Sequence, residues 1–292
     1  MAMRFSDVLE LLILSALWGG SFLFMRVAAP VLGPVWLIEG RVLLAGLALL
    51  PLLLRSHQKS TIRTDLKPLF IVGTINSALP FLFLAFASLS LPAGYTSIIN
   101  ATTPLFGTLV ATIWFQEKLT PARLMGLALG FTGVVMLIGL QPMSITSAVV
   151  SAIVAGLFAA IMYAIAAPYT KRHLSNTPPL VIATISQFSA ALALLPLLPF
   201  TAPAALPSAH ILLAVLALAL FSTAIAYLLY FRLIQNIGSS KALTVAYLVP
   251  VFAVLWGALF LNETITAAMI SGCGLILLGT ATANRTIKPA AQ

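Results

Sequence analysis

Apolar residues fill this chain in long runs that short polar turns separate. Ten such runs can be placed, at residues 7–28, 34–54, 67–88, 93–115, 121–140, 147–170, 179–200, 208–234, 240–261 and 267–284. About 20 mostly apolar residues let a helix cross ~30 Å of hydrocarbon, and a helix satisfies its own backbone hydrogen bonds there. The pattern therefore predicts an all-α polytopic membrane protein with ten transmembrane helices and no soluble domain.

Composition agrees with a membrane location. Of the 292 residues, 61% are hydrophobic and 7% are charged, against about 25% charged in a soluble domain. The only cysteine, Cys273, lies in an apolar run, which excludes a disulfide framework. The first run follows a basic residue, as in a signal peptide, but it is long and has a counterpart in the second half, so we expect it to be retained as a span.

The chain repeats one long segment. A shift of 146 residues lays residues 95–139 over the segment that begins at Lys241, and it aligns Pro104 with Pro250 without a gap. A repeat of this size is an internal duplication. We therefore expect two domains, residues 1–143 and residues 144–292, each a repeat of five helices.

Lysine and arginine positions predict the orientation. With the N-terminus in the cytoplasm, 13 of the 15 lie in inside segments, so both termini are predicted to be cytoplasmic. These residues are Arg4, Arg55, Lys59, Arg63, Lys67, Lys118, Arg123, Lys171, Arg172, Arg232, Lys241, Arg285 and Lys288. The exceptions are Arg26, at the outer end of the first span, and Arg41, within the second. This distribution accounts for the net charge of +9 without a nucleic-acid partner.

The two repeats are predicted to be inverted. Each has an odd number of spans, so the second must enter the membrane upside down, and Lys118 in an inside turn indeed aligns with Thr264 in an outside turn. Inverted repeats are common in transporters, where the substrate lies near the midplane between two halves that change which side is open. We therefore expect a central cavity between the repeats.

Two long segments carry a family resemblance. They read YTSIINATTPLFGTLVATIWFQEKLTPARLMGLALGFTGVV in the first half and LTVAYLVPVFAVLWGALFLNETITAAMISGCGLILLG in the second, and LWGGSFLFMR and RVLLAGLAL precede them. The chain resembles the EamA-type, ten-span drug/metabolite transporter superfamily and, within it, is most similar to the YddG-type exporters of amino acids. The resemblance implies a secondary transporter in the bacterial inner membrane that exports aromatic and other neutral or small amino acids, with broad specificity, by alternating access.

Polar residues within the spans mark a possible pathway, because they are costly in lipid unless they face a cavity or another helix. Asn100 shares one helical face with Thr96, Thr103 and Gly107, and Asn76 lies in the third span. A single Ser or Thr more often bonds a neighbouring helix, worth about 0.6 kcal/mol. For the two asparagines both interpretations stand.

Aromatic residues away from the membrane interfaces are further candidates. Trp18 and Tyr163, at a spacing of 145 residues, are interpreted as equivalent positions in the two halves, which predicts a symmetric pair whose rings enclose an apolar substrate side chain. Phe83 and Trp256 are expected to serve packing. The predicted substrate-binding residues are Trp18, Phe22, Asn76, Pro80, Asn100, Tyr163, Gln187, Tyr227 and Tyr247.

The second span carries two ionisable residues, Glu39 and Arg41, and Gln187 aligns with Arg41. Arg41 can attract a substrate carboxylate at the outer mouth or bond a carbonyl, and we favour the structural role. The middle of the first span has no acid, which counts against the small multidrug antiporters. Proton coupling is not predicted, although Glu39 could serve it.

Several repeated residues are expected to be structural. Pro104 and Pro250 each remove a backbone donor in mid-helix, so both spans should kink there. Glu117 and Glu263 each precede a threonine that can cap the next helix, with Pro121 at its first position, and their carboxylates should satisfy that helix's N-terminus.

Glycines in the fifth and tenth spans, residues 121–140 and 267–284, predict tight helix contact, either within a monomer or in a dimer through these two spans.

The sequence leaves several other functions to compare with amino-acid export. His57, His173 and His210 lie in loops away from any nucleophile or metal-ligand cluster, so we expect no enzyme activity, no cofactor and no bound metal. The alternative transport substrates are a sugar, a nucleotide sugar or a cationic drug. A phosphorylated substrate is disfavoured because no mid-span lysine or arginine exists outside the second span. A scaffold that transports nothing is the remaining alternative.

Overall fold

The structure, a computed structural model, describes residues 4–56, 65–116, 118–140, 144, 146–203 and 206–283. These residues form helices and contain no strand. In chain order the elements are α1 (Phe5–Leu32), α2 (Pro34–Arg55), α3 (Leu66–Gly73), η2 (Thr74–Ala78), α4 (Leu79–Ser90), α5 (Ala93–Asn100), α6 (Thr103–Phe115), α7 (Pro121–Gly139), α8 (Ser147–His173), α9 (Pro179–Leu194), η3 (Leu195–Phe200), α10 (Ala209–Ala219), η4 (Leu220–Ile225), α11 (Ala226–Ile237), α12 (Ser239–Ala242), α13 (Val245–Leu261) and α14 (Ala267–Ala283).

These elements make ten apolar spans. Eight are long and apolar enough to cross a membrane, with 19 to 29 residues each, and α13 and α14 are shorter apolar helices. At about 1.5 Å per residue, even the shorter pair approaches the thickness of the hydrocarbon core. The predicted ten-helix membrane fold is confirmed, and the spans begin and end within a few residues of the expected positions.

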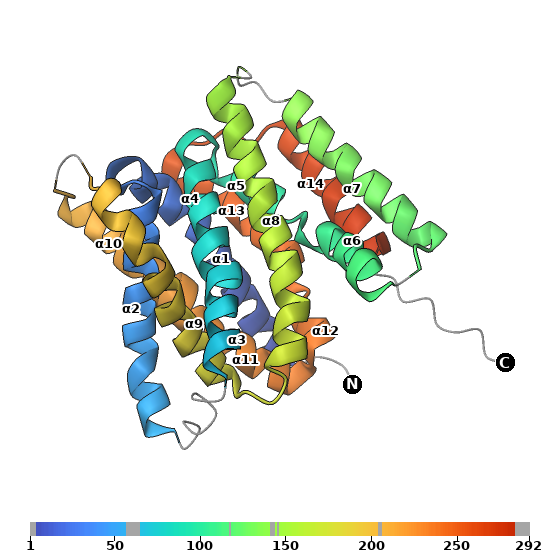
Figure 1. Cartoon of the computed structure of the whole chain (residues 1–292). Coiled ribbons are helices and arrows are strands. Elements are labelled where there is room, and N and C mark those ends of the chain that lie inside the picture. The colour runs from blue at the N-terminus through green and yellow to red at the C-terminus, as the bar shows by residue number, and fades with distance from the viewer. Residues whose placement is uncertain are drawn as a thin grey trace.

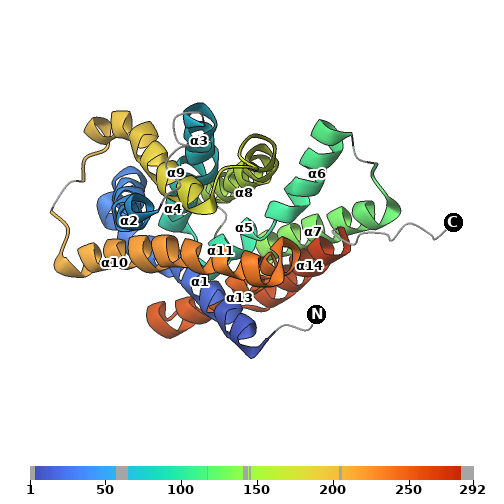
Figure 2. The same cartoon turned by 90° about the horizontal axis from the view of Figure 1, so that it is seen from below.

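The two halves are inverted copies. α7 and α14 run side by side at one edge of the bundle (Figures 1 and 2). The start of α7 lies against the end of α14, because a Cβ atom on Gly126 would lie 2.6 Å from the carbonyl oxygen of Gly279, and one on Gly133 would lie 2.8 Å from that of Gly272. The turns before these two helices therefore lie at opposite ends of the molecule, as the inversion predicts.

Local geometry repeats with the same spacing. The two π-helical segments, η2 and η4, begin 146 residues apart, at Thr74 and Leu220. Gln116 and Asn262, which end α6 and α13, both have a φ of 53°. The predicted boundary between residues 143 and 144 stays a prediction, since residue 143 lies outside the described residues.

The glycine faces of α7 and α14 are occupied within the chain. Each helix needs glycine there because a side chain would meet the backbone of the other at 3 Å or less. A dimer through these helices would have to use their other faces. Oligomeric state therefore stays a prediction.

The threonine caps are confirmed. The Thr120 hydroxyl accepts a hydrogen bond from the backbone N of Arg123 at 3.3 Å, and the Thr266 hydroxyl accepts one from that of Met269 at 3.2 Å. The expectation for Glu263 names the wrong helix: its Oε1 accepts from the backbone N of Ala93 at 2.9 Å, at the start of α5 in the other half. Glu117 lies outside the described residues, as do His57, Lys59, Arg63, Arg285 and Lys288.

The two prolines lie in different local structures. The span of residues 93–115 is broken at residues 101–102, so Pro104 lies in the first turn of α6. The hydroxyls of Thr102 and Thr103 bond the carbonyl oxygens of Ile99 and Asn100 at 2.6 and 2.7 Å, which satisfies groups left free by the break. In the second half the break falls at residues 243–244, and α13 runs without interruption through Pro250.

Candidate functional site

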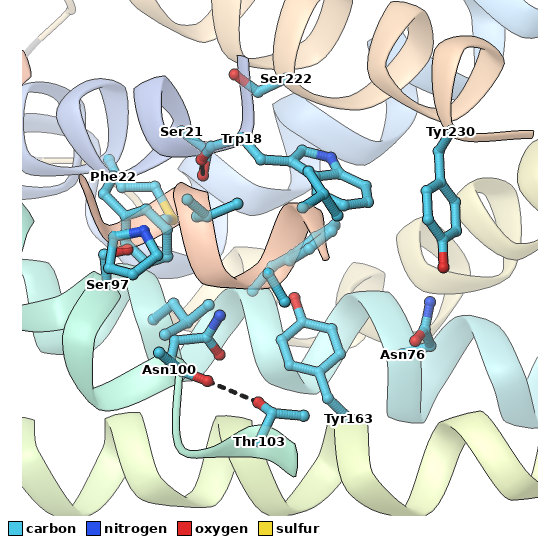
Figure 3. Close-up of a pocket in the computed structure, with 18 of the residues that line it drawn as sticks. Trp18, Ser21, Phe22, Asn76, Ser97, Asn100, Thr103, Tyr163, Ser222 and Tyr230 are labelled. Carbon is cyan, nitrogen blue, oxygen red and sulfur yellow. Dashed lines mark hydrogen bonds between the residues drawn. The ribbon is translucent and has the colours of Figure 1, made fainter. Parts of the chain in front are cut away.

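A cavity of about 360 Å³ lies among α1, α2, η2, α4, α5, α6, α8, η4, α11 and the start of α13. Six of the predicted residues line it: Trp18, Phe22, Asn76, Asn100, Tyr163 and Tyr227. Figure 3 shows several of these side chains directed into one space from different helices. The volume falls within the ~300–1,000 Å³ of small-molecule sites. We call this space the central cavity.

Three predicted residues lie elsewhere. Pro80 is buried in the first turn of α4. Gln187 is fully buried behind the cavity wall and donates to the Ser77 hydroxyl at 3.1 Å. Tyr247 lines a neighbouring cleft instead.

One wall of the central cavity is aromatic. The rings of Trp18 and Tyr230 lie 5.2 Å apart with planes tilted by 51°, which is a favourable arrangement for two aromatic rings. Both Trp18 and Tyr163 line the cavity, although the 146-residue shift aligns Trp18 with Ala164, one residue after Tyr163. The sequence prediction missed Tyr230, although it follows Tyr227 by three residues and shares its helical face.

The position of Trp18 depends on close packing of α1 against α13. A Cβ atom on Gly19 would lie 2.7 Å from Phe252 Cβ and 2.9 Å from the backbone N of Ala253, so glycine is required at this contact. One turn along α13, the Trp256 indole donates to the carbonyl oxygen of Ala16 at 3.0 Å. That bond agrees with the packing role expected of Trp256.

Two unpaired polar atoms lie within the cavity wall on α5. Because α5 ends at Asn100, the break places the last turn of this helix on the cavity wall. Asn100 Oδ1 and Ser97 Oγ are enclosed and have no hydrogen-bond partner among the described residues. Leaving a buried polar group unpaired costs about 1–3 kcal/mol, and a rotation of either side chain toward the cavity would let a donor group of a ligand recover that energy. Ser97 was not predicted.

Arg41 also lies on the cavity wall, and its oxygen partner is a hydroxyl group rather than the carbonyl expected for a structural role. It is 4% exposed. Its Nε donates to Thr223 Oγ1 at 2.9 Å, and its Cζ lies 3.5 Å from the centre of the Phe81 ring. The ion pair found among the described residues joins Arg232 to Glu10, so no described carboxylate neutralises Arg41.

A wider cleft of about 1420 Å³ leads from the central cavity to one end of the molecule. The two spaces share lining residues, among them Thr103 and Tyr163, so they are continuous. Arg123, Lys171 and Arg172 line the wide part of the cleft. We call this the basic end.

The opposite end, which we call the far end, is held by contacts between helices. Arg26 Nη1 donates to the carbonyl oxygens of Ser88 and Leu89 at 2.8 and 3.0 Å. Beside the bond from Ala93 to Glu263, the hydroxyls of Tyr95 and Thr266 lie 3.1 Å apart. The structure therefore represents a conformer that is open at the basic end.

The described residues contain no group of three or more His, Cys, Asp or Glu side chains that could hold a metal ion. The arrangement of the site is that of a binding chamber: one cation, unpaired neutral acceptors and aromatic surface around a space that one cleft reaches.

Known proteins are similar to this chain in sequence and in fold. The sequence pattern of the EamA-like transporter family matches residues 7–139 and again residues 150–285. The uncharacterized inner membrane transporter YedA of Escherichia coli is 29% identical over 94% of this chain and 90% of its own. A probable amino-acid metabolite efflux pump of Salmonella typhimurium is 26% identical, covering 92% of this chain and 91% of its own. A probable terminal-alkyne amino-acid exporter of Streptantibioticus cattleyicolor is 26% identical, covering 97% and 95%.

A solved crystal structure is similar over 97% of this chain and 98% of its own, with a TM-score of 0.67 and 20% sequence identity. This similarity supports the fold.

Proposed function

The chain belongs to the EamA-like transporter family, and on that premise we propose that it exports amino acids across a bacterial inner membrane by alternating access. The substrates are aromatic and other neutral or small amino acids, with broad specificity. The names of two relatives, an amino-acid metabolite efflux pump and a terminal-alkyne amino-acid exporter, support this class.

The observation that carries the proposal is the chemistry of the central cavity. Asn100 Oδ1 and Ser97 Oγ lack donors, and an ammonium group supplies up to three. Trp18 and Tyr230 offer apolar ring surface to a substrate side chain without a pocket of fixed shape. A chamber that recognises the common groups of amino acids and only encloses the side chain accepts many of them.

The cleft supports the direction of transport. Lysine and arginine are concentrated in cytoplasmic loops of membrane proteins, which supports a cytoplasmic location for the basic end and for both termini. The cavity of this conformer would then be loaded from inside the cell. Release requires the contacts at the far end to open while the cleft closes, as two inverted halves allow.

The chain's other partner is lipid. Large apolar side chains are exposed on the outer faces of the bundle, for example Ile113, Leu213 and Leu259, as a surface in contact with acyl chains requires. A buried and unneutralised Arg41 disfavours the alternative of a cationic drug, because like charges repel strongly away from water.

Vesicles that contain the purified protein test the proposal. Preloaded with labelled threonine, methionine or phenylalanine, they should release the label faster than protein-free vesicles. The variant Asn100→Trp, which fills the central cavity, should abolish release while the protein keeps its helix content and melting temperature. Absence of flux for every amino acid would refute the proposal. The same assay with and without a proton gradient tests coupling.

A further inference from the structure

We propose that Arg41 binds the carboxylate of the substrate, so that the central cavity selects ligands that carry one. The inference rests on the proposed amino-acid transport and adds the residue that recognises the acid group. It starts from a charge that the fold leaves uncompensated.

Arg41 is buried in a membrane-spanning helix without an acidic partner. Burying a charge costs several kcal/mol unless a counter-charge and hydrogen bonds offset it, and charged residues at this depth are rare outside pathways and ion pairs. No described carboxylate forms an ion pair with Arg41, since the pair that does form joins Arg232 to Glu10 at 2.8 Å. The missing counter-charge is what a bound carboxylate supplies.

The guanidinium group is held in a fixed orientation. Thr223 accepts the hydrogen bond from Nε, and the Phe81 ring lies against one face of the group. Nη1 has a sulfur atom, Met25 Sδ, at 3.9 Å, which is a weak acceptor, and Nη2 donates to no described residue without being an enclosed atom. The two terminal nitrogens therefore remain available toward the cavity, in the forked geometry that matches a carboxylate.

The inverted repeat shows that the fold does not need the charge. Gln187 aligns with Arg41, and Ser77 aligns with Thr223, both at 146 residues. Gln187 Nε2 donates to Ser77 Oγ at 3.1 Å, just as Arg41 Nε donates to Thr223 Oγ1 at 2.9 Å. A neutral amide thus makes the same contact between a helix of one half and the π-helical turn of the other. What differs is that Gln187 is sealed from the cavity whereas Arg41 lines it.

This asymmetry gives an amino acid one direction in the cavity. Its carboxylate lies against Arg41, and its ammonium group lies near Asn100 and Ser97, whose enclosed, unpaired oxygens can accept from it once these side chains turn toward the cavity. The side chain then extends along the rings of Trp18 and Tyr230.

The test combines a change in the ligand with a change in the protein. Flux into vesicles is measured with labelled phenylalanine and with phenylalaninamide, which keeps the ammonium group and the ring but has a neutral amide in place of the carboxylate. Wild-type protein should have a KM for the amide about 10- to 100-fold higher than for the acid, as expected for the loss of a charge-assisted hydrogen bond.

Arg41→Gln copies the residue of the second half, so it can keep the bond to Thr223 while the charge is lost. It should raise the KM for phenylalanine to near that for the amide and leave the amide's KM unchanged. Arg41→Lys should restore part of the preference. The control Arg55→Gln removes an exposed charge from the same helix and should alter neither KM.

The outcomes separate the two proposals. No flux of any amino acid by wild-type protein refutes both. Transport of phenylalanine with an unchanged KM in Arg41→Gln, or equal KM values for acid and amide in wild-type protein, refutes the role of Arg41 and leaves amino-acid transport standing. If Arg41→Gln fails to fold, the KM values of wild-type protein for phenylalanine and phenylalaninamide still test whether the cavity selects a carboxylate.

Discussion

Replacing Glu263 by alanine should open the far end of the molecule. Glu263 belongs to the turn between α13 and α14, yet it accepts a hydrogen bond from the backbone N of Ala93, at the start of α5 in the other half, at 2.9 Å. The carboxylate also lies at the positive end of the α5 dipole. The bond joins elements that must separate when the far end opens, so its loss favours the conformer that is open there.

The size of the effect follows from the contact. A hydrogen bond to a charged group is worth about 1.5–3 kcal/mol. Glu263 Oε2 is enclosed without a partner, which offsets part of that gain, so we expect the lower figure and a shift of about tenfold in the conformational equilibrium. Glu263→Gln keeps an acceptor for Ala93 and removes only the charge, so its shift should be several times smaller.

Cysteine labelling measures the shift. In a Cys273→Ala background, Leu84→Cys places a thiol on the wall of the central cavity, and a membrane-impermeant reagent is added to intact cells from the side of the far end. Glu263→Ala should raise the labelling rate about tenfold, in line with the shift in population. The control Asp65→Ala likewise removes an acidic acceptor, here bonded by the Thr177 hydroxyl at 2.6 Å, from a contact that does not belong to the far end. Equal labelling rates with and without Glu263→Ala would refute the reasoning.

Three further predictions concern the contact between α7 and α14, the aromatic wall of the central cavity and the opposite orientation of the two halves. Gly279→Val should lower the melting temperature by several degrees, because even a Cβ atom there would lie 2.5 Å from the backbone of α7, whereas Gly274→Ala, with nothing within 4 Å, should leave it unchanged. Trp18→Ala should raise the KM for phenylalanine about tenfold and that for threonine less, and equal effects on both would exclude ring contact with the substrate. Cysteines that replace Lys118 and Thr264 should be labelled from opposite sides of the membrane; labelling from one side would contradict the inverted repeat.

The sequence alone was sufficient for the frame of the molecule. Length and hydrophobicity define the ten spans because lipid leaves the backbone few alternatives to a helix. The 146-residue repeat and the reversed loop charges define the inversion. The threonine caps at Thr120 and Thr266 were also predictable, since each acts on amides within its own chain segment.

The sequence could not predict contacts that join distant segments. Glu263 was expected to act on the helix that follows it, since sequence reasoning considers neighbours along the chain, whereas the inverted packing brings the start of α5 beside it. The positions of the helix breaks were missed for a related reason. Identical prolines at Pro104 and Pro250 suggested identical bends, but threonine hydroxyls at positions 102 and 103 satisfy the broken turn in the first half, and Leu248 and Val249 stand at the aligned positions in the second.

The residues that line the central cavity could be predicted from the sequence only in part. Asn76 and Asn100 were predicted because polar residues within a span are costly unless they face a cavity or another helix. Trp18 was predicted because tryptophan usually lies at the membrane interfaces rather than in the middle of a span. Ser222 lines the cavity and was missed, although it aligns with Asn76 at the 146-residue spacing. Comparing each predicted residue with the residue 146 positions away in the other half would have identified Ser222.

The departures from symmetry point to the chemistry of transport. Two inverted halves with identical side chains would offer a substrate two equivalent poses, and a zwitterion would bind in either direction. Arg41 opposite Gln187 removes one of them, and the break of α5 at Asn100 has no equivalent at the same position of α13. The inverted repeat therefore allows the motion that changes which end is open, and the residues that differ between the two copies bind the substrate. For a duplicated transporter of this kind, positions where the two copies align but differ in charge are the first places to look for the residues that bind the substrate.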